Sequence, residues 1–366
     1  MSKAYSVVLL PGDGIGPEVT AAAVAALNLV AETEGFAINY TECPVGGAAI
    51  DSHQNPLPDD VLEQCLAADA VLLGAVGGPK WDHHTGPMRP ESGLLKLRKA
   101  LGAFANLRPV AVPDSLADAS PLRADAVRGT DMLVVRELTG GIYFGEPRGR
   151  EPDGDGEKAY NTMVYTTEEI DRVARVAFDW AGKRRRSVTS VDKANVLVVS
   201  QLWRDVVAQV HKKDFSGIDL QHMYVDNAAM QLVLNPRQFD VIVTGNLFGD
   251  ILSDAAATLG GSLGLLPSAS VGGRVGLFEP VHGSAPDIAG QGKANPIAAL
   301  LSVAMMMDFL GEARAAGAIR HGVNEALDAG ARTADLCREG HRRVSTEEMT
   351  QEVVRGIQAH LASPAS

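Results

Sequence analysis

The stretch FDVIVTGNLFGDILSDAAA, residues 239–257, indicates the fold of this chain most directly. It opens on an apolar run at 239–243 that is typical of a buried strand, and it continues into a segment that we expect to be a helix. Asp250 and Asp254 stand four residues apart, so they share one face of that helix. Open α/β sheets bind ligands at the carboxyl ends of their strands, which is where this helix begins.

The aspartate pair favours a divalent cation site. Two carboxylates on one face repel each other unless a cation lies between them, and Mg²⁺ binds proteins through one or two carboxylates. An ordinary solvated helix face is the alternative, and for an isolated pair it stays open. The place of Asp250 and Asp254 directly after a strand favours the cation site.

Apolar runs alternate with helix-like segments through most of the sequence, which indicates α/β architecture. Besides 239–243, the expected strands are 5–10, 70–73, 132–136, 188–191 and 223–225. The loop PGDGIGPEV at 11–19 is close to a dinucleotide fingerprint, but the G-x-G-x-x-G spacing fails because residue 17 is proline. A proline suits the first turn of a helix instead. We therefore expect no standard Rossmann domain.

Length and composition predict a globular protein with two domains. The chain has 366 residues, and a prior of about 150 residues per domain gives two. The net charge of −12 disfavours a nucleic-acid partner. Three widely spaced cysteines suit a reducing cytosol. The N-terminus shows no signal-peptide pattern, and the longest apolar stretch, 297–307, is well under the ~20 residues that span a bilayer. We expect a cytoplasmic protein without a membrane partner, and a buried helix at 297–307.

A polar stretch rich in glycine and proline, RGREPDGDGEK at 148–158, interrupts the alternation. Residues 160–166 follow it and alternate like a strand. The pattern predicts a loop with a projecting arm, and an interdomain linker is the alternative.

The helix expected in ESGLLKLRKAL, residues 91–101, has an unusual face. Glu91, Leu94, Leu95 and Arg98 fall at positions 0, 3, 4 and 7, so they share one side of the helix. A ligand with a carboxylate and a branched apolar tail would match this combination. An ordinary amphipathic helix, with Arg98 extending its charge to water, is the equally weighted alternative.

Two further arginines stand at strand boundaries, Arg108 in NLRPV and Arg136 in VVREL. Arginine presents a planar fork that binds a carboxylate through two hydrogen bonds. Together with Arg98 they could hold a dicarboxylate, although each alone has a structural or surface role as its simpler interpretation.

Three more residues have side chains suited to acid–base chemistry beside a cation. Tyr143 lies between glycines in TGGIYFGEPRG, Lys193 ends a strand in SVDKANV, and Asp226 stands at a strand-to-helix junction in YVDNAAM. Nearby charges and burial can bring the pKa values of tyrosine and lysine toward neutrality. Asp226 adds a third carboxylate of the type that Mg²⁺ prefers.

The run HGSAPDIAGQGKANP at 282–296 favours a nucleotide. Its small residues let backbone amides approach phosphates or an adenine ring. A carboxylate at Asp287 could accept hydrogen bonds from ribose hydroxyls and would repel a 2′-phosphate, which favours NAD over NADP.

These motifs together resemble the isocitrate/isopropylmalate family of β-decarboxylating dehydrogenases. The resemblance extends over nearly the whole length, through segments that include LLPGDGIGPEV, GAVGGPKWD, ESGLLKLRKAL, NLRPV, TGGIYFGEPR, DKANV, GNLFGDILSD, GLFEPVHGSAPDIAG and KANP. It implies a two-domain α/β fold that is not a standard Rossmann domain. Residues 1–103 plus 261–366 would form an NAD-binding domain, and 104–260 would form a substrate, metal and dimerisation domain with an arm near 148–166.

The resemblance also implies a role for each matching residue. Arg98, Arg108 and Arg136 would bind the two malate carboxylates of the substrate. Tyr143 would be the acid that reprotonates the product, and Lys193 the base or proton relay at the substrate hydroxyl. Mg²⁺ or Mn²⁺ would be held by Asp226, Asp250 and Asp254.

The nucleotide site and the oligomer follow from the same resemblance. NAD would contact Gly78, Glu91, His282, Gly283, Ser284, Ala285, Asp287, Ile288 and Asn295. Lys193 and Asp226 would reach the active site of a partner subunit, so the enzyme would be an obligate homodimer.

Within this family, residues 91–98 distinguish isopropylmalate enzymes from isocitrate enzymes. Isocitrate enzymes bind a third carboxylate here, which Glu91 would repel, whereas Leu94 and Leu95 offer an apolar pocket for an isopropyl group. The expected reaction is therefore NAD-dependent oxidative decarboxylation of 3-isopropylmalate, in leucine biosynthesis. Malate or tartrate relatives stay open, because an apolar pocket discriminates by only ~1–3 kcal/mol per methylene. A Mg²⁺-dependent phosphoryl transferase is disfavoured, because the sequence has no G-x-x-x-x-G-K-[ST] loop.

Overall fold

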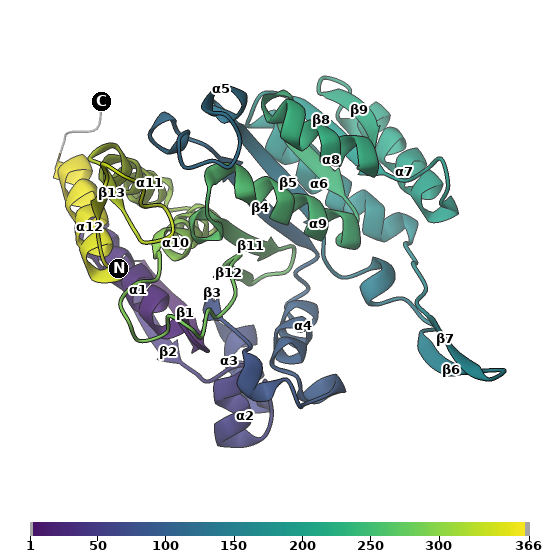
Figure 1. Cartoon of the computed structure of the whole chain (residues 1–366), viewed down its shortest axis with the longest axis horizontal. Coiled ribbons are helices and arrows are strands. Elements are labelled where there is room, and N and C mark those ends of the chain that lie inside the picture. The colour runs from purple at the N-terminus through teal and green to yellow at the C-terminus, as the bar shows by residue number, and fades with distance from the viewer. Residues whose placement is uncertain (1–2, 363–366) are drawn as a thin grey trace. The chain divides into compact units, whose positions relative to one another are not determined.

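The computed structural model describes residues 3–362, which form two compact α/β units (Figure 1). Unit 1 is built from Met1–Ala103, Pro113–Pro121 and Gly260–Ser366, and unit 2 from Phe104–Val112 and Leu122–Leu259. Each unit has a mostly parallel set of strands with helices packed on it. The predicted α/β class, without a standard Rossmann domain, is confirmed. The functional division into a nucleotide domain and a substrate domain stays a prediction.

The strands of unit 1 follow the order β2-β1-β3-β12-β11, and every neighbouring pair is parallel except β11 with β12. The strands are β1 (Ala4–Gly12), β2 (Ala37–Glu42), β3 (Ala70–Ala75), β11 (Pro267–Val271) and β12 (Gly276–Pro280), with a separate short pair, β13 (Ala331–Arg332) and β14 (Arg342–Arg343). The helices are α1 (Gly16–Glu34), α2 (Gly47–His53), α3 (Asp59–Ala67), α4 (Pro90–Ala100), α10 (Ile297–Leu310), α11 (Ala313–Asp328) and α12 (Thr346–Ala362).

The strands of unit 2 follow the order β4-β5-β10-β8-β9, and only β4 runs antiparallel to its neighbour. They are β4 (Ala105–Ala111), β5 (Asp131–Glu137), β8 (Ser187–Asp192), β9 (Asp219–Tyr224) and β10 (Val241–Thr244). The helices are α5 (Ala124–Val127), α6 (Thr167–Gly182), α7 (Val198–Asp214), α8 (Val225–Leu234) and α9 (Asn246–Ala257), and a 3₁₀ turn at Gly141–Tyr143 follows β5.

Helix boundaries follow from local sequence. Pro17 lies in the first turn of α1, where its missing N–H is harmless, and Gly35 ends the helix with a φ of 77°. Thr166 and Glu169 cap α6 reciprocally, each side chain accepting from the other's backbone N–H. Helix α10 is buried on nearly all sides, as its apolar sequence predicts. No helix within residues 3–362 has the length and apolarity needed to cross a membrane.

Two sequence-based strand boundaries are wrong. The strand expected at 223–225 is β9, which begins earlier, and Val225 is already the first residue of α8. The strand expected over 160–166 does not form, because β7 (Gly156–Tyr160) ends where the expected strand begins. The chain then leads directly to Thr166, the capping residue of α6.

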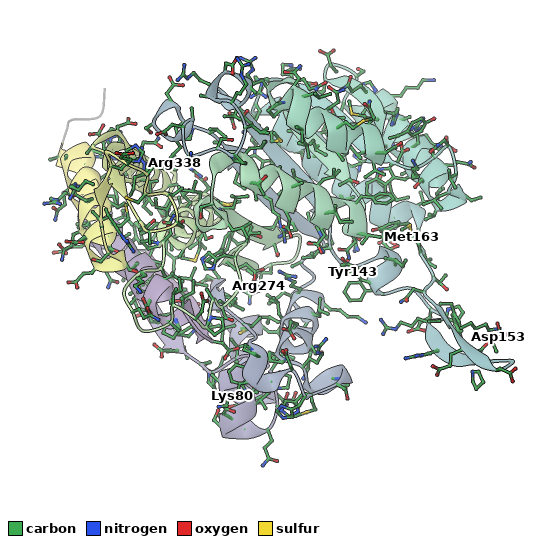
Figure 2. The ribbon with its side chains drawn as sticks, in the orientation of Figure 1. Lys80, Tyr143, Asp153, Met163, Arg274 and Arg338 are labelled. Carbon is green, nitrogen blue, oxygen red and sulfur yellow. The ribbon has the colours of Figure 1, made fainter. Side chains whose placement is uncertain are left out.

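The polar stretch near 148–158 forms an isolated hairpin. It consists of β6 (Gly149–Asp153) and β7, and all the residues of both strands are exposed. Figure 1 shows the hairpin projecting from the rest of unit 2, and Figure 2 labels Asp153 at the end of β6, beside the turn. The structure therefore has an arm in this region.

A short segment inside the expected substrate domain belongs to unit 1 instead. Pro113–Pro121 is bound by side chains from the C-terminal part of the chain. Arg338, labelled in Figure 2, donates from Nη2 to the Ala119 carbonyl at 2.6 Å, and Arg332 donates to the Ser115 carbonyl. Composition gave no sign of this excursion, because the contacts join residues more than 200 positions apart.

Candidate functional site

Arg108 and Arg136 lie on one face of the unit 2 sheet. In the antiparallel pair β4–β5, Asn106 stands opposite Arg136, and Arg108 follows Asn106 by two residues. Side chains two apart on a strand, and side chains directly opposite on neighbouring strands, share a face. Helix α9 packs on β4 and β5, so it meets both arginines.

Arg136 is buried and oriented by the first residue of α9. Its Nε and Nη2 donate to Asn246 Oδ1 at 3.0 and 2.7 Å, while Asn246 Nδ2 donates to the Leu138 and Gly140 carbonyls at 3.1 Å each. The remaining Nη1 contacts Asp250. The helix comes this close because residue 249 is glycine: a Cβ there would lie 2.7 Å from Arg136 Cγ.

Arg108 is held in a similar way. Its Nε donates to Asn106 Oδ1 at 2.8 Å, and its Nη1 donates to Ser253 Oγ at 2.7 Å and to Asp254 Oδ1 at 2.8 Å. The side chain of Asp254 is 57% exposed, whereas that of Arg108 is only 8% exposed. The buried Arg108 guanidinium therefore holds the Asp254 carboxylate at the exposed side of the site.

Tyr143, at the end of the 3₁₀ turn, completes the cluster. Its hydroxyl donates to Asp250 Oδ2 at 3.0 Å, and the Arg136 guanidinium lies 5.8 Å from the centre of its ring. Burial, followed by the negative charge and hydrogen bond of Asp250, raises the pKa of Tyr143. A tyrosine hydroxyl is protonated at neutral pH at its ordinary pKa of about 10, and the upward shift leaves it so, which means that the proton is present for transfer.

Lys193 and Asp226 form a second cluster in unit 2. Lys193 follows β8, Asp226 lies in the first turn of α8, and their Nζ and Oδ1 atoms are 2.9 Å apart. The hydrogen bond from Lys193 lowers the pKa of Asp226, so the carboxylate stays ionised. The two clusters thus place an acid and a lysine on separate elements of the same unit.

The carboxylates fit a hard divalent cation by chemistry and exposure. Asp250 and Asp254 present oxygen ligands from one helix face, with side chains 33% and 57% exposed. Within residues 3–362 of one chain, however, no three acidic, histidine or cysteine side chains come together as a metal set. Asp226 therefore does not join the pair within one subunit.

In unit 1, the face of α4 differs from a simple amphipathic helix. Arg98 does not extend to water: its side chain is 14% exposed, and Nη2 donates to the buried Glu279 Oε1 at 2.6 Å. Its Nε is buried without a hydrogen-bond partner, so one donor is left for a ligand. Leu95 is exposed, whereas Leu94 is half-buried against the core beside β3. Glu91 is exposed at the start of the helix.

Three stretches predicted to bind the nucleotide come close together in unit 1. A Cβ at Gly78 would lie 3.8 Å from Ser284 Oγ, and a Cβ at Gly77 would lie 2.7 Å from Glu91 Oε1. Ile15 donates its N–H to the Ser284 carbonyl at 2.8 Å. A Cβ at Gly14, whose φ is +59°, would lie 2.0 Å from the same carbonyl oxygen. Gly14, which fitted the incomplete G-x-G-x-x-G spacing, thus allows a close approach to the protein backbone at Ser284, and its role is not to bind a phosphate.

The remaining residues predicted to bind NAD differ in how exposed they are and in whether their polar atoms already have partners. Asp287 and Gly283 are exposed, and Ala285 and Ile288 are half-buried. His282 Nε2 is buried without a partner, and burial lowers the pKa of this histidine. The side chain of Asn295 is already engaged, since Nδ2 donates to Asp335 and Oδ1 accepts from the Ile297 N–H. One N–H and one acceptor site of the Asn295 amide group are left to meet a ligand.

The sequence reasoning missed the residues that hold the predicted ones. Asn246, Ser253 and Glu279 contact Arg136, Arg108 and Arg98 respectively. All three stand inside motifs quoted above, and Asn246 and Ser253 lie on the same helix as the aspartate pair. Helical spacing from Asp250 could have identified Asn246, four residues earlier, whereas Glu279 carries no local signal.

The α/β fold and this cluster of arginines, carboxylates and tyrosine define an enzyme suited to a small anionic substrate. The comparisons with known proteins specify the family. The model of the isocitrate/isopropylmalate dehydrogenase family matches residues 6–353, so the chain belongs to that family.

Curated relatives cover the chain almost completely. The 3-isopropylmalate dehydrogenase of Salinibacter ruber is 63% identical over 96% of this chain and 95% of its own length. The enzyme of that name from Wolinella succinogenes is 54% identical over 98% and 99%.

Solved structures agree on the fold. An isocitrate dehydrogenase from Methylococcus capsulatus has a TM-score of 0.85 at 35% identity, with 97% of this chain and 99% of that chain covered. A β-decarboxylating dehydrogenase from Thermococcus kodakarensis has a TM-score of 0.80 at 36% identity, with 97% and 96% covered.

Proposed function

We propose that this chain catalyses the NAD-dependent oxidative decarboxylation of (2R,3S)-3-isopropylmalate to 4-methyl-2-oxopentanoate and CO₂, in leucine biosynthesis in the cytoplasm. The observation that carries the proposal is the 63% identity, over 96% of the chain, to an enzyme named for this substrate. The site residues supply the matching chemistry.

The arginines are the proposed carboxylate ligands. Arg108 and Arg136 are fixed by Asn106 and Asn246, so little ordering is needed when a substrate carboxylate arrives. Arg98 would bind through the Nε that has no protein partner. On the same helix, the exposed Leu95 would contact the isopropyl group, with Leu94 behind it, and Glu91 would repel a third carboxylate.

Two bound groups complete the proposed site. NAD would lie on the stretch around Gly78, Glu91 and 282–295, with Asp287 at its ribose, and would accept the hydride. Mg²⁺ or Mn²⁺ would be held by Asp250 and Asp254 with Asp226 of a second subunit, and would stabilise negative charge on substrate oxygens.

The chain's own groups move the protons. Lys193, as a neutral amine or as a proton relay, takes the proton of the substrate hydroxyl while the carbon that bears this hydroxyl loses hydride and becomes a ketone. The carboxylate β to that ketone leaves as CO₂, and its electron pair stays on the adjacent carbon as an enolate. Tyr143, whose hydroxyl is protonated at neutral pH, donates a proton to that carbon and releases the product.

The substrate assignment is tested by comparing kcat/KM for 3-isopropylmalate, D-malate and isocitrate, first with NAD⁺ and then with NADP⁺. We expect the highest value for 3-isopropylmalate with NAD⁺. D-malate lacks the isopropyl group, which is about the size of three methylenes, so its kcat/KM should be lower by at least about 100-fold. A higher kcat/KM for isocitrate would contradict the assignment of 3-isopropylmalate as the substrate. A higher kcat/KM with NADP⁺ would contradict the proposed role of Asp287 at the ribose.

We further propose a homodimer in which Lys193 and Asp226 reach the partner's active site. Large apolar side chains are exposed on α8, on α9, and just before and at the start of α7, in the same unit as these two residues. They are Val196, Val198, Met230, Val233, Leu234 and Ile251. Exposed apolar side chains gathered in one region mark protein–protein contacts. A second copy is the fitting partner, because one chain brings no third carboxylate to Asp250 and Asp254 within the described residues.

Leu234→Glu tests this surface. Leu234 is 71% exposed, so the substitution is harmless to a monomer but would bury an unpaired charge in a dimer. We expect the dimer dissociation constant to rise by about 100-fold or more, and activity to fall at low enzyme concentration. Light scattering after size-exclusion chromatography measures the first effect. Leu66→Glu, at an exposed leucine of unit 1, is the control and should leave the dimer intact. An unchanged dimer in Leu234→Glu contradicts the assigned surface.

A further inference from the structure

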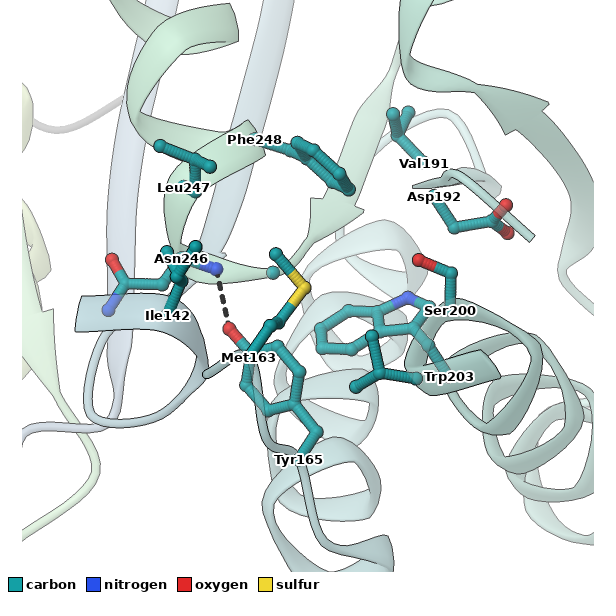
Figure 3. A pocket seen from close by; sticks show the side chains of 12 residues that line it. Ile142, Met163, Tyr165, Val191, Asp192, Ser200, Trp203, Asn246, Leu247 and Phe248 are labelled. Atoms are coloured by element: carbon teal, nitrogen blue, oxygen red, sulfur yellow. Dashed lines mark hydrogen bonds between the residues drawn. The ribbon is translucent and has the colours of Figure 1, made fainter. Parts of the chain in front are cut away.

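Behind the acid–base cluster lies a small cavity of about 20 Å³ that the mechanism above does not use (Figure 3). It is lined mainly by apolar groups, among them Met163, Phe248 and the rings of Tyr165 and Trp203. The two rings meet edge-on at 5.3 Å between centroids. One of these lining residues, Tyr165, also contacts Asn246 at the start of α9.

The hydroxyl of Tyr165 accepts a hydrogen bond from the backbone N–H of Asn246 at 2.7 Å, the dashed line in Figure 3. Asn246 is the first residue of α9, so Tyr165 satisfies one of the N–H groups that a helix start leaves without a partner. The side chain of the same asparagine holds Arg136. One hydroxyl therefore supports both the guanidinium and the helix that carries Asp250.

The ring of Tyr165 also lies against the turn that carries Tyr143. A Cβ at Gly140 would lie 2.8 Å from Tyr165 Cε1, and a Cβ at Gly141 would lie 2.6 Å from its hydroxyl oxygen. A Cβ at Gly245, just before α9, would lie 3.1 Å from the same ring. The glycines let both segments press on one side chain.

Glu137 fixes the turn that lies beside the tyrosine. The glutamate is fully buried and accepts the N–H groups of Thr139 and Gly140 at 2.9 and 2.8 Å. The cavity leaves room beside the Tyr165 ring, so close packing alone does not fix the ring. The hydrogen bond from the Asn246 N–H supplies the missing constraint.

We propose that Tyr165 is a positioning residue, which sets the distance between the Tyr143 hydroxyl and Asp250 by holding the 3₁₀ turn and the start of α9 against one ring. It touches neither substrate nor cofactor. The inference rests on the proposed function, since it assigns Tyr165 to the step in which Tyr143 donates its proton.

Tyr165→Phe is the test, because it keeps the ring and removes only the hydroxyl. We expect kcat to fall by about 10- to 100-fold, as for small misplacements of catalytic groups, while KM for NAD⁺ stays unchanged. The affinity of the substrate-free enzyme for Mn²⁺, measured by calorimetry, should weaken as well, because α9 carries the proposed ligands.

Trp203→Phe is the matched control. It removes the indole N–H that donates to Ser190 Oγ at 3.3 Å in the same cavity, without touching Asn246. Its kcat should stay near that of the unmodified enzyme at a comparable melting temperature. A normal kcat in Tyr165→Phe, or an equal fall in both variants, overturns the proposal.

A second pair of variants reaches the same contact from the helix side. Gly245→Ala pushes its new Cβ against the Tyr165 ring, whereas Gly182→Ala, at the end of α6, meets open space. Only the first should lower kcat, and equal rates in the two would also contradict the inference. An unmodified enzyme without activity on 3-isopropylmalate would instead defeat the proposed function.

Discussion

Replacing Lys193 by alanine is expected to lower kcat by about 10³-fold, the usual contribution of a positioned acid or base. Its Nζ lies 2.9 Å from Asp226, and in the proposed mechanism it takes the proton of the substrate hydroxyl. The stretch 282–295, which we propose to bind NAD, belongs to the other unit, so the affinity for NADH should stay unchanged. Steady-state rates and a fluorescence titration with NADH measure the two quantities.

The control is Lys213→Ala, which removes an exposed lysine near the end of α7 in the same unit. It should leave both quantities at their original values. A Lys193→Ala enzyme that turns over at nearly the normal rate would remove lysine from the mechanism.

Mixed dimers decide whether Lys193 acts in its own subunit or in the partner's. Chains carrying Lys193→Ala and chains carrying Tyr143→Phe are each expected to be nearly inactive alone. If the lysine crosses the interface, a mixed dimer contains one site with both residues intact and one with neither. Half of randomly paired dimers are mixed, so about a quarter of the normal activity should return. If the lysine stays in its own subunit, no site is complete and no activity returns.

Removal of the divalent cation is expected to abolish turnover, and excess Mg²⁺ or Mn²⁺ should restore it. The cation would stabilise charge on substrate oxygens, which none of the arginines can do at the hydroxyl that must lose its proton. Asp250→Asn should have an effect of similar size, about 10³-fold on kcat/KM, because it removes one ligand charge. Its fold should survive, since Arg136 keeps both hydrogen bonds to Asn246.

Calorimetric titration with Mn²⁺ separates loss of binding from loss of chemistry in Asp250→Asn. Asp179→Asn, at an exposed carboxylate on α6, is the control and should bind the ion normally. Full turnover in the presence of a chelator would eliminate the metal from the proposal, whatever the variant shows.

Local patterns predicted the parts of this molecule whose causes are local. The sequence predicts strand β10 and the helix after it because apolar runs and helical spacing need only neighbours, although β10 begins at Val241, two residues after the expected strand. The shared helix face of the two aspartates in α9 and the proline in the first turn of α1 are also features with local causes.

The other features depend on partners far away in the chain. Helical spacing left Arg98 open between a ligand-binding and a surface role, whereas its guanidinium is paired with Glu279, 181 residues later. Leu94 and Leu95 looked equivalent, but only the sheet that α4 packs on distinguishes the half-buried one from the exposed one. The supporting roles of Asn246 and Tyr165 likewise need the turn after β5 and the start of α9 to be adjacent. Such adjacency is set by tertiary packing, which a single sequence does not display.

The excursion of Pro113–Pro121 into unit 1 bears on how the molecule is made. The chain passes between the two units at 103/104, 112/113, 121/122 and 259/260, so neither unit is a removable piece. Unit 2 is synthesised before β11, β12 and the last three long helices. Strand β3 must therefore wait for β12 at its side, and its apolar edge stays exposed until unit 2 has been synthesised. Unit 2 can fold during translation, whereas unit 1, which contains the stretch proposed to bind NAD, is completed last, so chaperones would have most to protect there.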